Sequence, residues 1–234
     1  MKVIAGVVLG VLLLAYPVYS EDQSPLKDQK DKVSYAIGVD IANTLKRQSI
    51  EVNKEVFMKG LNDALSGGKI MMTDQEMRET LAAFSKEMMT KQAEAAKKLG
   101  EKNKLEGEAF LAENKKKEGV KTLPSGLQYK VITEGTGKTP TANDTVTVNY
   151  RGTFIDGKEF DSSYKRGQPA TFPVKGVIPG WTEALQLMKE GAKWQLVVPS
   201  NLAYGDKGAG GLIGPNATLI FDVELISVKE SEKK

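Results

Sequence analysis

The distribution of proline divides this chain into two parts that can fold in different ways. No proline occurs from Leu26 to Leu123, whereas residues 124–234 hold seven of the nine prolines and 14 of the 23 glycines. Proline interrupts helices and glycine favours turns, so the first part is free to be helical while the second is confined to short strands and turns. We therefore expect an α+β protein.

Two short amphipathic helices are predicted before residue 72. One apolar face recurs every four residues at Val33, Ile37 and Ile41. A second apolar run occupies residues 56–65 and is closed by the glycine pair at 67–68. Because a segment of about 50 residues buries too little surface for a core of its own, we expect a second copy to cover it. We assign residues 21–72 as a helical dimerisation domain.

A long helix is predicted for residues 73–118. It starts at Thr73-Asp-Gln-Glu76, which has the form of a capping box. Its apolar stripe is Met77, Leu81, Phe84 and Met88. At 1.5 Å per residue the helix would be roughly 70 Å long, although Gly100 and Gly107 should each weaken it by ~1 kcal/mol. Twenty of its 46 residues are charged and both signs are mixed, which favours a solvated connecting helix.

Five of the eight methionines gather around the start of this helix, at Met71, Met72, Met77, Met88 and Met89. Methionine is polarisable and adaptable, so such a cluster suits either a helix–helix seam or a surface that binds varied clients. We favour a core or dimer seam and keep client binding as the alternative.

The second half shows the two-residue alternation of β-strands. Apolar residues alternate with polar ones around Val146, Val148 and Tyr150, around Trp194, Leu196 and Val198, and from Leu219 to Leu225. After Pro179-Gly180, the helical spacing of Trp181, Leu185 and Met188 indicates one short helix. We expect residues 119–234 to form an antiparallel sheet that closes over this helix.

The composition excludes several classes of site. The chain has no histidine and no cysteine, so it has no Ser-His-Asp triad, no thiol nucleophile, no disulfide and no His- or Cys-ligated metal. We expect no cofactor. Its net charge of +3 is spread evenly, with 8 acids and 8 bases in residues 21–72 and 10 of each in residues 73–118. No segment has the one-signed charge that nucleic-acid binding usually needs.

The first twenty residues are predicted to be an export signal. Lys2 precedes a 13-residue apolar run from Val3 to Ala15, and a cleavage point follows Ser20. This run is shorter than the ~20 residues of a membrane-spanning helix. We therefore expect removal of residues 1–20 and an exported protein, in the periplasm or at the outer-membrane surface, without a stable membrane anchor.

Two features of the second half are candidates for a binding site. The glycine cluster at Gly205, Gly208, Gly210, Gly211 and Gly214 has the spacing of a phosphate loop, but Pro215 and a strand follow it instead of a helix. We interpret it as a flexible, close-packed flap. Six aromatic residues form the other candidate: Tyr150, Phe160, Phe172, Trp181, Tyr204 and Phe221. By pattern alone, aromatic residues in strands are more often core than pocket.

Five segments make the second half recognisable. They are Val148-Asn-Tyr-Arg-Gly-Thr153, Phe160-Asp-Ser-Ser163, Val177-Ile-Pro-Gly-Trp181, Ala203-Tyr-Gly205 and the run from Gly214 to Leu225. In this order, across residues 122–228, they resemble the FKBP-type peptidyl-prolyl cis-trans isomerases. The export signal and the helices resemble the macrophage-infectivity-potentiator and FkpA branch of that family, whose members are exported homodimers.

This resemblance implies a five- or six-stranded sheet around the Trp181 helix and an active site above Trp181. The implied catalytic residues are Tyr150, Asp161, Tyr204 and Phe221. The implied substrate-binding residues are Phe160, Phe172, Val177, Ile178, Trp181, Leu212 and Ile213. The family uses the Ile178 backbone N–H and the Tyr204 hydroxyl as hydrogen-bond donors. The implied substrates are X-Pro bonds in unfolded or partly folded exported polypeptides, and macrolides are possible inhibitors.

Two alternatives remain beside an isomerase. The protein could be a dimeric periplasmic chaperone that binds clients between its arms, with isomerase activity secondary. It could also be an FKBP domain that binds without catalysis, although all six aromatic residues and Asp161 match the family.

Overall fold

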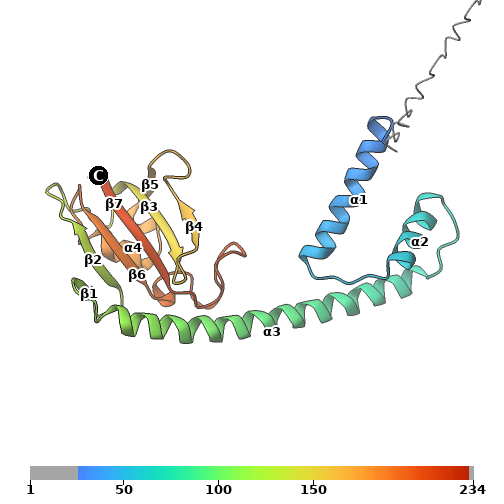
Figure 1. Cartoon of the computed structure of the whole chain (residues 1–234), viewed down its shortest axis with the longest axis horizontal. Coiled ribbons are helices and arrows are strands. Elements are labelled where there is room, and N and C mark those ends of the chain that lie inside the picture. Colours follow the sequence, from blue (N-terminus) through green and yellow to red (C-terminus); the bar gives the residue numbers. More distant parts are fainter. Residues whose placement is uncertain (1–25, 232–234) are drawn as a thin grey trace, which may run out of the picture. The chain divides into compact units, whose positions relative to one another are not determined.

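The computed structural model describes residues 26–231 (Figure 1). The predicted export signal lies outside the described residues. Contacts divide the chain into two units, residues 1–73 and residues 74–234, and each unit is described by itself. Among the described residues, no helix combines the length and the apolar character needed to cross a bilayer.

The first unit contains the two predicted short helices, α1 (Gln29–Arg47) and α2 (Lys54–Leu65). Each begins at a side-chain cap: Asp28 accepts a hydrogen bond from the Asp31 N–H, and Asn53 accepts from two backbone N–H groups in the first turn of α2. Neither helix has a buried residue. The apolar face that predicted α1 is therefore uncovered, with Ile37 56 % exposed.

The second unit begins with α3 (Asp74–Asn114), which ends four residues before the predicted boundary. Its end has a local cause, because the N–H of Lys117 turns back to the carbonyl of Asn114 and Gly119 adopts a positive φ of 78°. The turn at 115–119 leads directly into the first strand of the sheet.

The described part of the sheet has seven strands, one more than the resemblance implies at most. They are β1 (Val120–Thr122), β2 (Gln128–Thr133), β3 (Thr145–Phe154), β4 (Glu159–Ser162), β5 (Ala170–Pro173), β6 (Lys193–Val198) and β7 (Leu219–Lys229). The order is β1-β2-β6-β7-β3-β4, with β5 paired to β3, and every pairing is antiparallel. The predicted α+β fold is confirmed.

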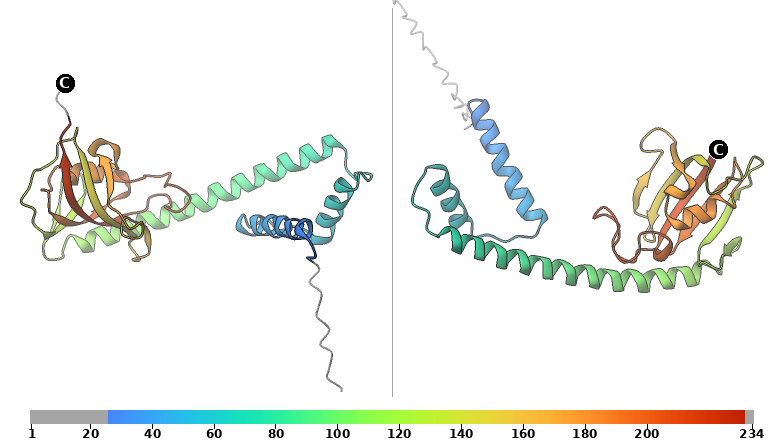
Figure 2. Two further views of the ribbon diagram at one scale, coloured as in Figure 1. Left: turned by 90° about the horizontal axis from the view of Figure 1, so that it is seen from above. Right: turned by 180° about the vertical axis from the view of Figure 1, so that it is seen from behind.

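The short helix α4 (Pro179–Leu185) lies against one face of this sheet, as Figure 2 shows. Its Trp181, Ala184 and Leu185 are buried together with inward-facing residues of β3, β6 and β7. Burial alternates along β3 with the two-residue period that predicted the strand. The core of this unit therefore fills the space between α4 and the sheet.

The C-terminal half of α3 packs directly on the same domain. Gly100, Gly107 and Asn114 are its buried positions. A Cβ on Gly107 would lie 2.4 Å from Thr218 Oγ1, and a Cβ on Gly100 would lie 3.1 Å from Pro215 Cβ. The prediction of a solvated helix therefore holds for most side chains of this half but not for the narrow stripe at these three buried positions. The two glycines weaken the helix locally but permit a close contact with the segment before β7.

Candidate active site

A cavity of about 410 Å³ opens beside α4. It is lined by Tyr150, Phe160, Asp161, Phe172, Gly176, Val177, Ile178, Trp181, Tyr204 and Phe221. Nine of these ten residues are among the predicted site residues, and the structure brings them together from β3, β4, β5, α4, β7 and the intervening loops. Gly176 is the one lining residue that sequence reasoning missed, because it contributes backbone and carries no side chain to mark it.

The indole of Trp181 forms the floor of the cavity and is only 4 % exposed. Its ring meets Tyr150, Phe172 and Phe221 nearly at right angles, with centroid distances of 5.2, 6.2 and 5.3 Å. Phe160 in turn meets Phe221 edge-to-face at 5.6 Å. Such perpendicular contacts are favourable for aromatic rings and hold each ring in one orientation. The result is an apolar hollow with stiff walls.

A glycine in β3 makes room for these rings. A Cβ added to Gly152 would lie 2.7 Å from Phe160 Cζ and 3.0 Å from Phe221 Cε1. Both distances are too short for carbon atoms in contact. Glycine is ordinarily unfavourable inside a strand, and here it allows two cavity walls to lie against the strand backbone.

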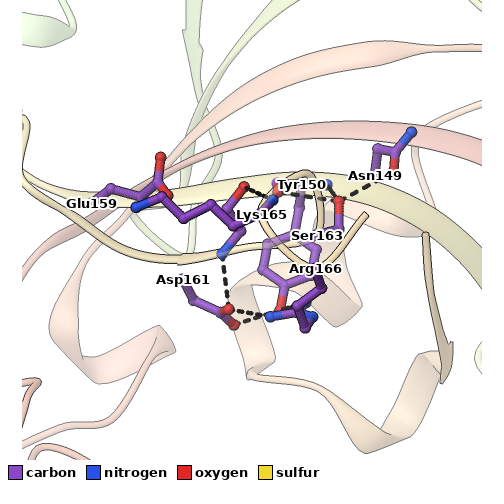
Figure 3. A network of polar contacts seen from close by, with 8 residues as sticks. Asn149, Tyr150, Glu159, Asp161, Ser163, Lys165 and Arg166 are labelled. Carbon is purple, nitrogen blue, oxygen red and sulfur yellow. Dashed lines mark hydrogen bonds and ion pairs between the residues drawn. The ribbon is translucent and has the colours of Figure 1, made fainter. Parts of the chain in front are cut away.

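One wall of the cavity carries a connected polar group, shown in Figure 3. The Tyr150 hydroxyl donates to Asp161 Oδ2 at 2.5 Å, and Arg166 Nη2 donates to the same hydroxyl at 2.7 Å. Arg166 Nη1 also pairs with Asp161 Oδ1, which accepts a further hydrogen bond from the Ser162 N–H at 2.8 Å. The guanidinium lies over the Tyr150 ring, 5.3 Å from its centroid. Sequence reasoning missed Arg166.

Ser163 ties this polar group to the sheet. Its side chain is fully buried, accepts from the Tyr150 N–H at 2.9 Å and donates to Asn149 Oδ1 at 3.1 Å. Its own N–H donates to the Tyr150 carbonyl at 3.0 Å. The end of β4, which carries Asp161, is thereby fixed to β3, which carries Tyr150, and this sets the distance between the two groups.

Two hydrogen-bond donors at the cavity are left without an internal acceptor. Within residues 26–231, the Tyr204 hydroxyl makes no hydrogen bond, and the Ile178 N–H has no acceptor at the start of α4. Tyr204 is 39 % exposed. These are the two donors that the sequence resemblance implies, and both are available to a bound ligand.

The comparisons with known proteins agree with this geometry. Residues 136–226 match the family described as FKBP-type peptidyl-prolyl cis-trans isomerase. Residues 30–131 match the family described as the domain amino terminal to FKBP-type peptidyl-prolyl isomerase. This chain belongs to the FKBP-type peptidyl-prolyl cis-trans isomerases. Membership confirms the predicted family and the predicted class of enzyme.

Several relatives match over most of their length. The chain is 48 % identical to the outer membrane protein MIP of Legionella longbeachae, over 99 % of both chains. It is 52 % identical to the peptidyl-prolyl cis-trans isomerase Mip of Coxiella burnetii, over 88 % of this chain and 90 % of the relative. The crystal structure of FkpA from Escherichia coli superposes with a TM-score of 0.67 at 43 % identity, over 87 % of this chain and 98 % of FkpA.

The protonation states of the isomerase site follow from its contacts. Burial on its own would raise the pKa of Asp161, but hydrogen bonds from Tyr150 and Arg166 and the charge of Arg166 outweigh it, so the pKa lies below its usual value. Burial, and then the hydrogen bond to Asp161, raise the pKa of Tyr150. Burial, and then the charge of Asp161, raise the pKa of Tyr204. At neutral pH the site thus holds a carboxylate and two phenols.

The structure does not bring Leu212 and Ile213 into the lining of the isomerase cavity, although both are predicted substrate contacts. Ala209 and Ile213 exchange two backbone hydrogen bonds of 2.8 and 2.9 Å, which fold the glycine cluster into a tight hairpin. The Ile213 side chain then enters the core at 9 % exposure, while Leu212 remains 53 % exposed. A Cβ on Gly208 would lie 2.1 Å from the Ile213 carbonyl oxygen, so the hairpin requires glycine there.

A larger hollow of about 790 Å³ lies away from the isomerase cavity, between the loop before β3 and the end of β7. Its lining is mainly polar, and its charged groups already have partners. Lys138 pairs with Glu230, and Asp144 accepts hydrogen bonds from Thr141 and from the Ser231 N–H. It offers no aromatic surface for a proline ring, so we assign the chemistry to the smaller cavity.

Proposed function

We propose that the aromatic cavity binds the proline ring of an X-Pro segment and lowers the barrier to rotation about the preceding peptide bond. One observation carries this proposal: a stiff apolar hollow bears a single connected polar group on one wall and two unpaired donors. In our assignment Phe160, Phe172, Val177, Ile178 and Trp181 bind substrate. Tyr150, Asp161, Tyr204 and Phe221 act on the reacting bond.

The proposed mechanism needs no nucleophile. Planarity of the peptide bond is maintained by resonance, and rotation costs about 18–20 kcal/mol. In the twisted transition state that resonance is lost and the amide has less charge separation, so an apolar site stabilises it more than the planar ground state. Removing ~5 kcal/mol from the barrier would accelerate the reaction by roughly four decades. In this proposal the Ile178 N–H and the Tyr204 hydroxyl donate hydrogen bonds to the substrate carbonyl.

We expect kcat/KM for a proline tetrapeptide to stay constant between about pH 5 and pH 9. The chain has no histidine, the pKa of Asp161 is lowered, and the pKa values of Tyr150 and Tyr204 are raised. No group of the site therefore titrates in this interval. The measurement is a pH profile of the mature protein, corrected with the uncatalysed rate at each pH. A bell-shaped profile within the interval would contradict a mechanism without proton transfer.

The contribution of the Asp161 carboxylate to the stability of the fold should decrease in acid. Because the pKa of Asp161 is lower in the folded protein, its carboxylate stabilises the fold fully above the unfolded value near 3.9. This stabilisation is lost as the pH falls through the folded pKa. Any loss of activity in the acid range should accordingly begin below about pH 4 and leave the neutral range unchanged.

We further propose that the isomerase acts on exported polypeptides in the periplasm as a homodimer. The predicted signal at residues 1–20 and the similarity to the outer membrane protein MIP of Legionella longbeachae support export. The first unit supports a partner copy, because neither α1 nor α2 buries a residue within one chain. Large apolar side chains on α1 and α2 are exposed, including Ile37, Val56 and Leu65.

A chaperone function is a second proposal, supported by the exposed methionines. Met71 is 76 % exposed and Met89 is 68 % exposed, and further exposed apolar residues lie near them in the sequence, namely Ile70, Met72, Leu81 and Phe84. Groups of exposed apolar side chains often mark sites of interaction with other proteins. Methionine surfaces adapt to varied partners. In this proposal exposed methionines contact unfolded clients, and the cavity isomerises their X-Pro bonds.

Deletion of residues 21–90 from the mature protein separates these functions. The deletion retains the part of α3 that packs on the isomerase domain, namely Leu99, Gly100, Asn103, Gly107 and Asn114. We expect tetrapeptide turnover within about twofold of the full protein, a monomer in sedimentation at micromolar concentration, and loss of aggregation suppression. A monomeric full-length protein would refute the dimer, and undiminished suppression by the deletion variant would refute the role of the deleted residues in client binding.

A further inference from the structure

The loop that carries Tyr204 is held at both ends by backbone hydrogen bonds. On its N-terminal side, the Gly205 N–H donates to the Ser200 carbonyl at 2.8 Å. On its C-terminal side, the Asn216 N–H donates to the Gly205 carbonyl at 2.8 Å. The base of the loop is therefore closed at the residue that follows Tyr204. Because the Tyr204 hydroxyl has no partner within residues 26–231, the position of this ring depends on the backbone of its loop.

Helix α3 contacts the same closing point through a reciprocal pair of asparagines. Asn103 Nδ2 donates to the Pro215 carbonyl at 2.8 Å, and Asn216 Nδ2 donates to the Gly100 carbonyl at 3.3 Å. Both bonds join residues more than 100 positions apart in the chain. Asn216 has a positive φ of 55°, a conformation that asparagine tolerates better than most residues. In this conformation its side chain donates to the helix while its backbone N–H donates to the loop.

Apolar packing reinforces these hydrogen bonds. A Cβ on Gly214 would lie 3.0 Å from Leu99 Cδ2, and a Cβ on Gly100 would lie 3.1 Å from Pro215 Cβ. Glycine on each side of the contact thus lets helix and loop approach closely. The loop that carries Tyr204 rests on α3 at its base, while its glycine-rich tip projects beyond the contact as a separate hairpin.

We propose that Asn103 and Asn216 are positioning residues for Tyr204, so that α3 forms part of the construction of the active site. The pair fixes Pro215 and Asn216, the Asn216 N–H fixes Gly205, and Gly205 fixes the adjacent Tyr204. This inference rests on the proposed role of Tyr204 in binding the substrate carbonyl. In this proposal α3 helps to position Tyr204 in addition to connecting two parts of the chain.

The test is a double-mutant cycle in the full mature protein. Asn103→Ala removes the donor to Pro215, and alanine is a better helix former than asparagine, so the helix itself is not weakened. We expect kcat/KM for a proline tetrapeptide to fall by about fivefold in Asn103→Ala. In the Tyr204→Phe background the same substitution should change kcat/KM by less than about twofold. Lys104→Ala, at the exposed neighbouring position, is the matched control and should have no effect.

Amide hydrogen exchange provides a readout that does not depend on catalysis. The backbone N–H of Asn216 should exchange faster in Asn103→Ala than in Lys104→Ala. Its hydrogen bond to the Gly205 carbonyl should open more often once the hydrogen bond from Asn103 to the Pro215 carbonyl is removed. Amides in the middle of β7 should exchange at equal rates in both variants. This pattern locates the effect at the base of the loop instead of in the stability of the whole domain.

The outcomes separate this inference from the proposed function. If Tyr204→Phe alone leaves turnover unchanged, the assigned role of Tyr204 is wrong and the catalytic part of the inference fails with it. If Tyr204→Phe lowers turnover while Asn103→Ala acts equally in both backgrounds, the asparagine has a general structural role and positioning of Tyr204 is refuted. Unchanged Asn216 exchange in Asn103→Ala would refute the contact as a constraint on the loop.

Discussion

Substitution of Asp161 by leucine is expected to lower kcat/KM for a proline tetrapeptide by roughly 10- to 100-fold. The carboxylate accepts hydrogen bonds from Tyr150, Arg166 and the Ser162 N–H. Leucine removes the acceptor for all three donors and leaves the guanidinium without its carboxylate. The Tyr150 hydroxyl would then lose its acceptor and keep only the hydrogen bond that it accepts from Arg166. The measurement is a protease-coupled or direct assay of tetrapeptide isomerisation.

Two further variants separate charge from geometry. Asp161→Asn keeps an acceptor oxygen and the side-chain volume, so we expect a smaller loss than for leucine if the acceptor is what matters. Glu159→Gln is the matched control on the same strand, because Glu159 pairs with Arg151 and Lys165 and does not line the cavity. Turnover of Asp161→Leu at the level of Glu159→Gln would contradict the assignment of Asp161 to the site.

Replacement of Trp181 by alanine is expected to cost about 3–5 kcal/mol in the free energy of unfolding and to abolish most activity of the folded fraction. Trp181 is 4 % exposed and supports the rings of Tyr150, Phe172 and Phe221. Removing it leaves a void beneath all three rings, so the cavity loses both its floor and the order of its walls. Urea unfolding followed by circular dichroism measures the stability.

Trp194→Ala is a closely matched control for this prediction. Trp194 is also buried at 6 % exposure, and both indole Nε1 atoms lack a partner among the described residues. Its ring stacks on Tyr129 with centroids 4.3 Å apart and does not line the cavity. We expect a similar loss of stability but near-normal turnover per folded molecule. Equal losses of turnover in both variants would show that general destabilisation, and not the cavity floor, determines activity.

Much of the fold could be predicted because its signals are local. The absence of proline from residue 26 to residue 123 and the periodicity of apolar residues depend only on neighbours in the chain, and they correctly placed α1, α2 and the main strands. The predicted end of α3 was less accurate. A turn with Gly119 at a positive φ ends the helix before the charged sequence pattern ends. The shortest strands, β1, β4 and β5, carry too few residues for a periodic signal.

The candidate site also contains residues that the sequence predicted and residues that only tertiary contacts reveal. Nine of the predicted residues line one cavity, and all of them except Phe172 lie in the five distinctive segments of the sequence. Arg166 was missed since a basic residue in a loop is ordinarily solvated, and only its contacts with Asp161 and Tyr150 distinguish it. Leu212 and Ile213 were misplaced because the bonds between Ala209 and Ile213 decide which way the hairpin turns its side chains.

By itself, the sequence determined the classes of chemistry open to this protein and the aromatic residues of its site. A chain without histidine or cysteine is limited to carboxylates, hydroxyls, lysines, the backbone or the shape of an apolar pocket. Only the tertiary structure decided that Gly100, Gly107 and Asn103 belong with the isomerase domain. In the sequence the two glycines are defects in a helix and the asparagine is an ordinary polar residue. Their contacts with residues 214–218 span more than 100 positions, and no local pattern records a contact over that separation, because it arises from packing between elements already formed.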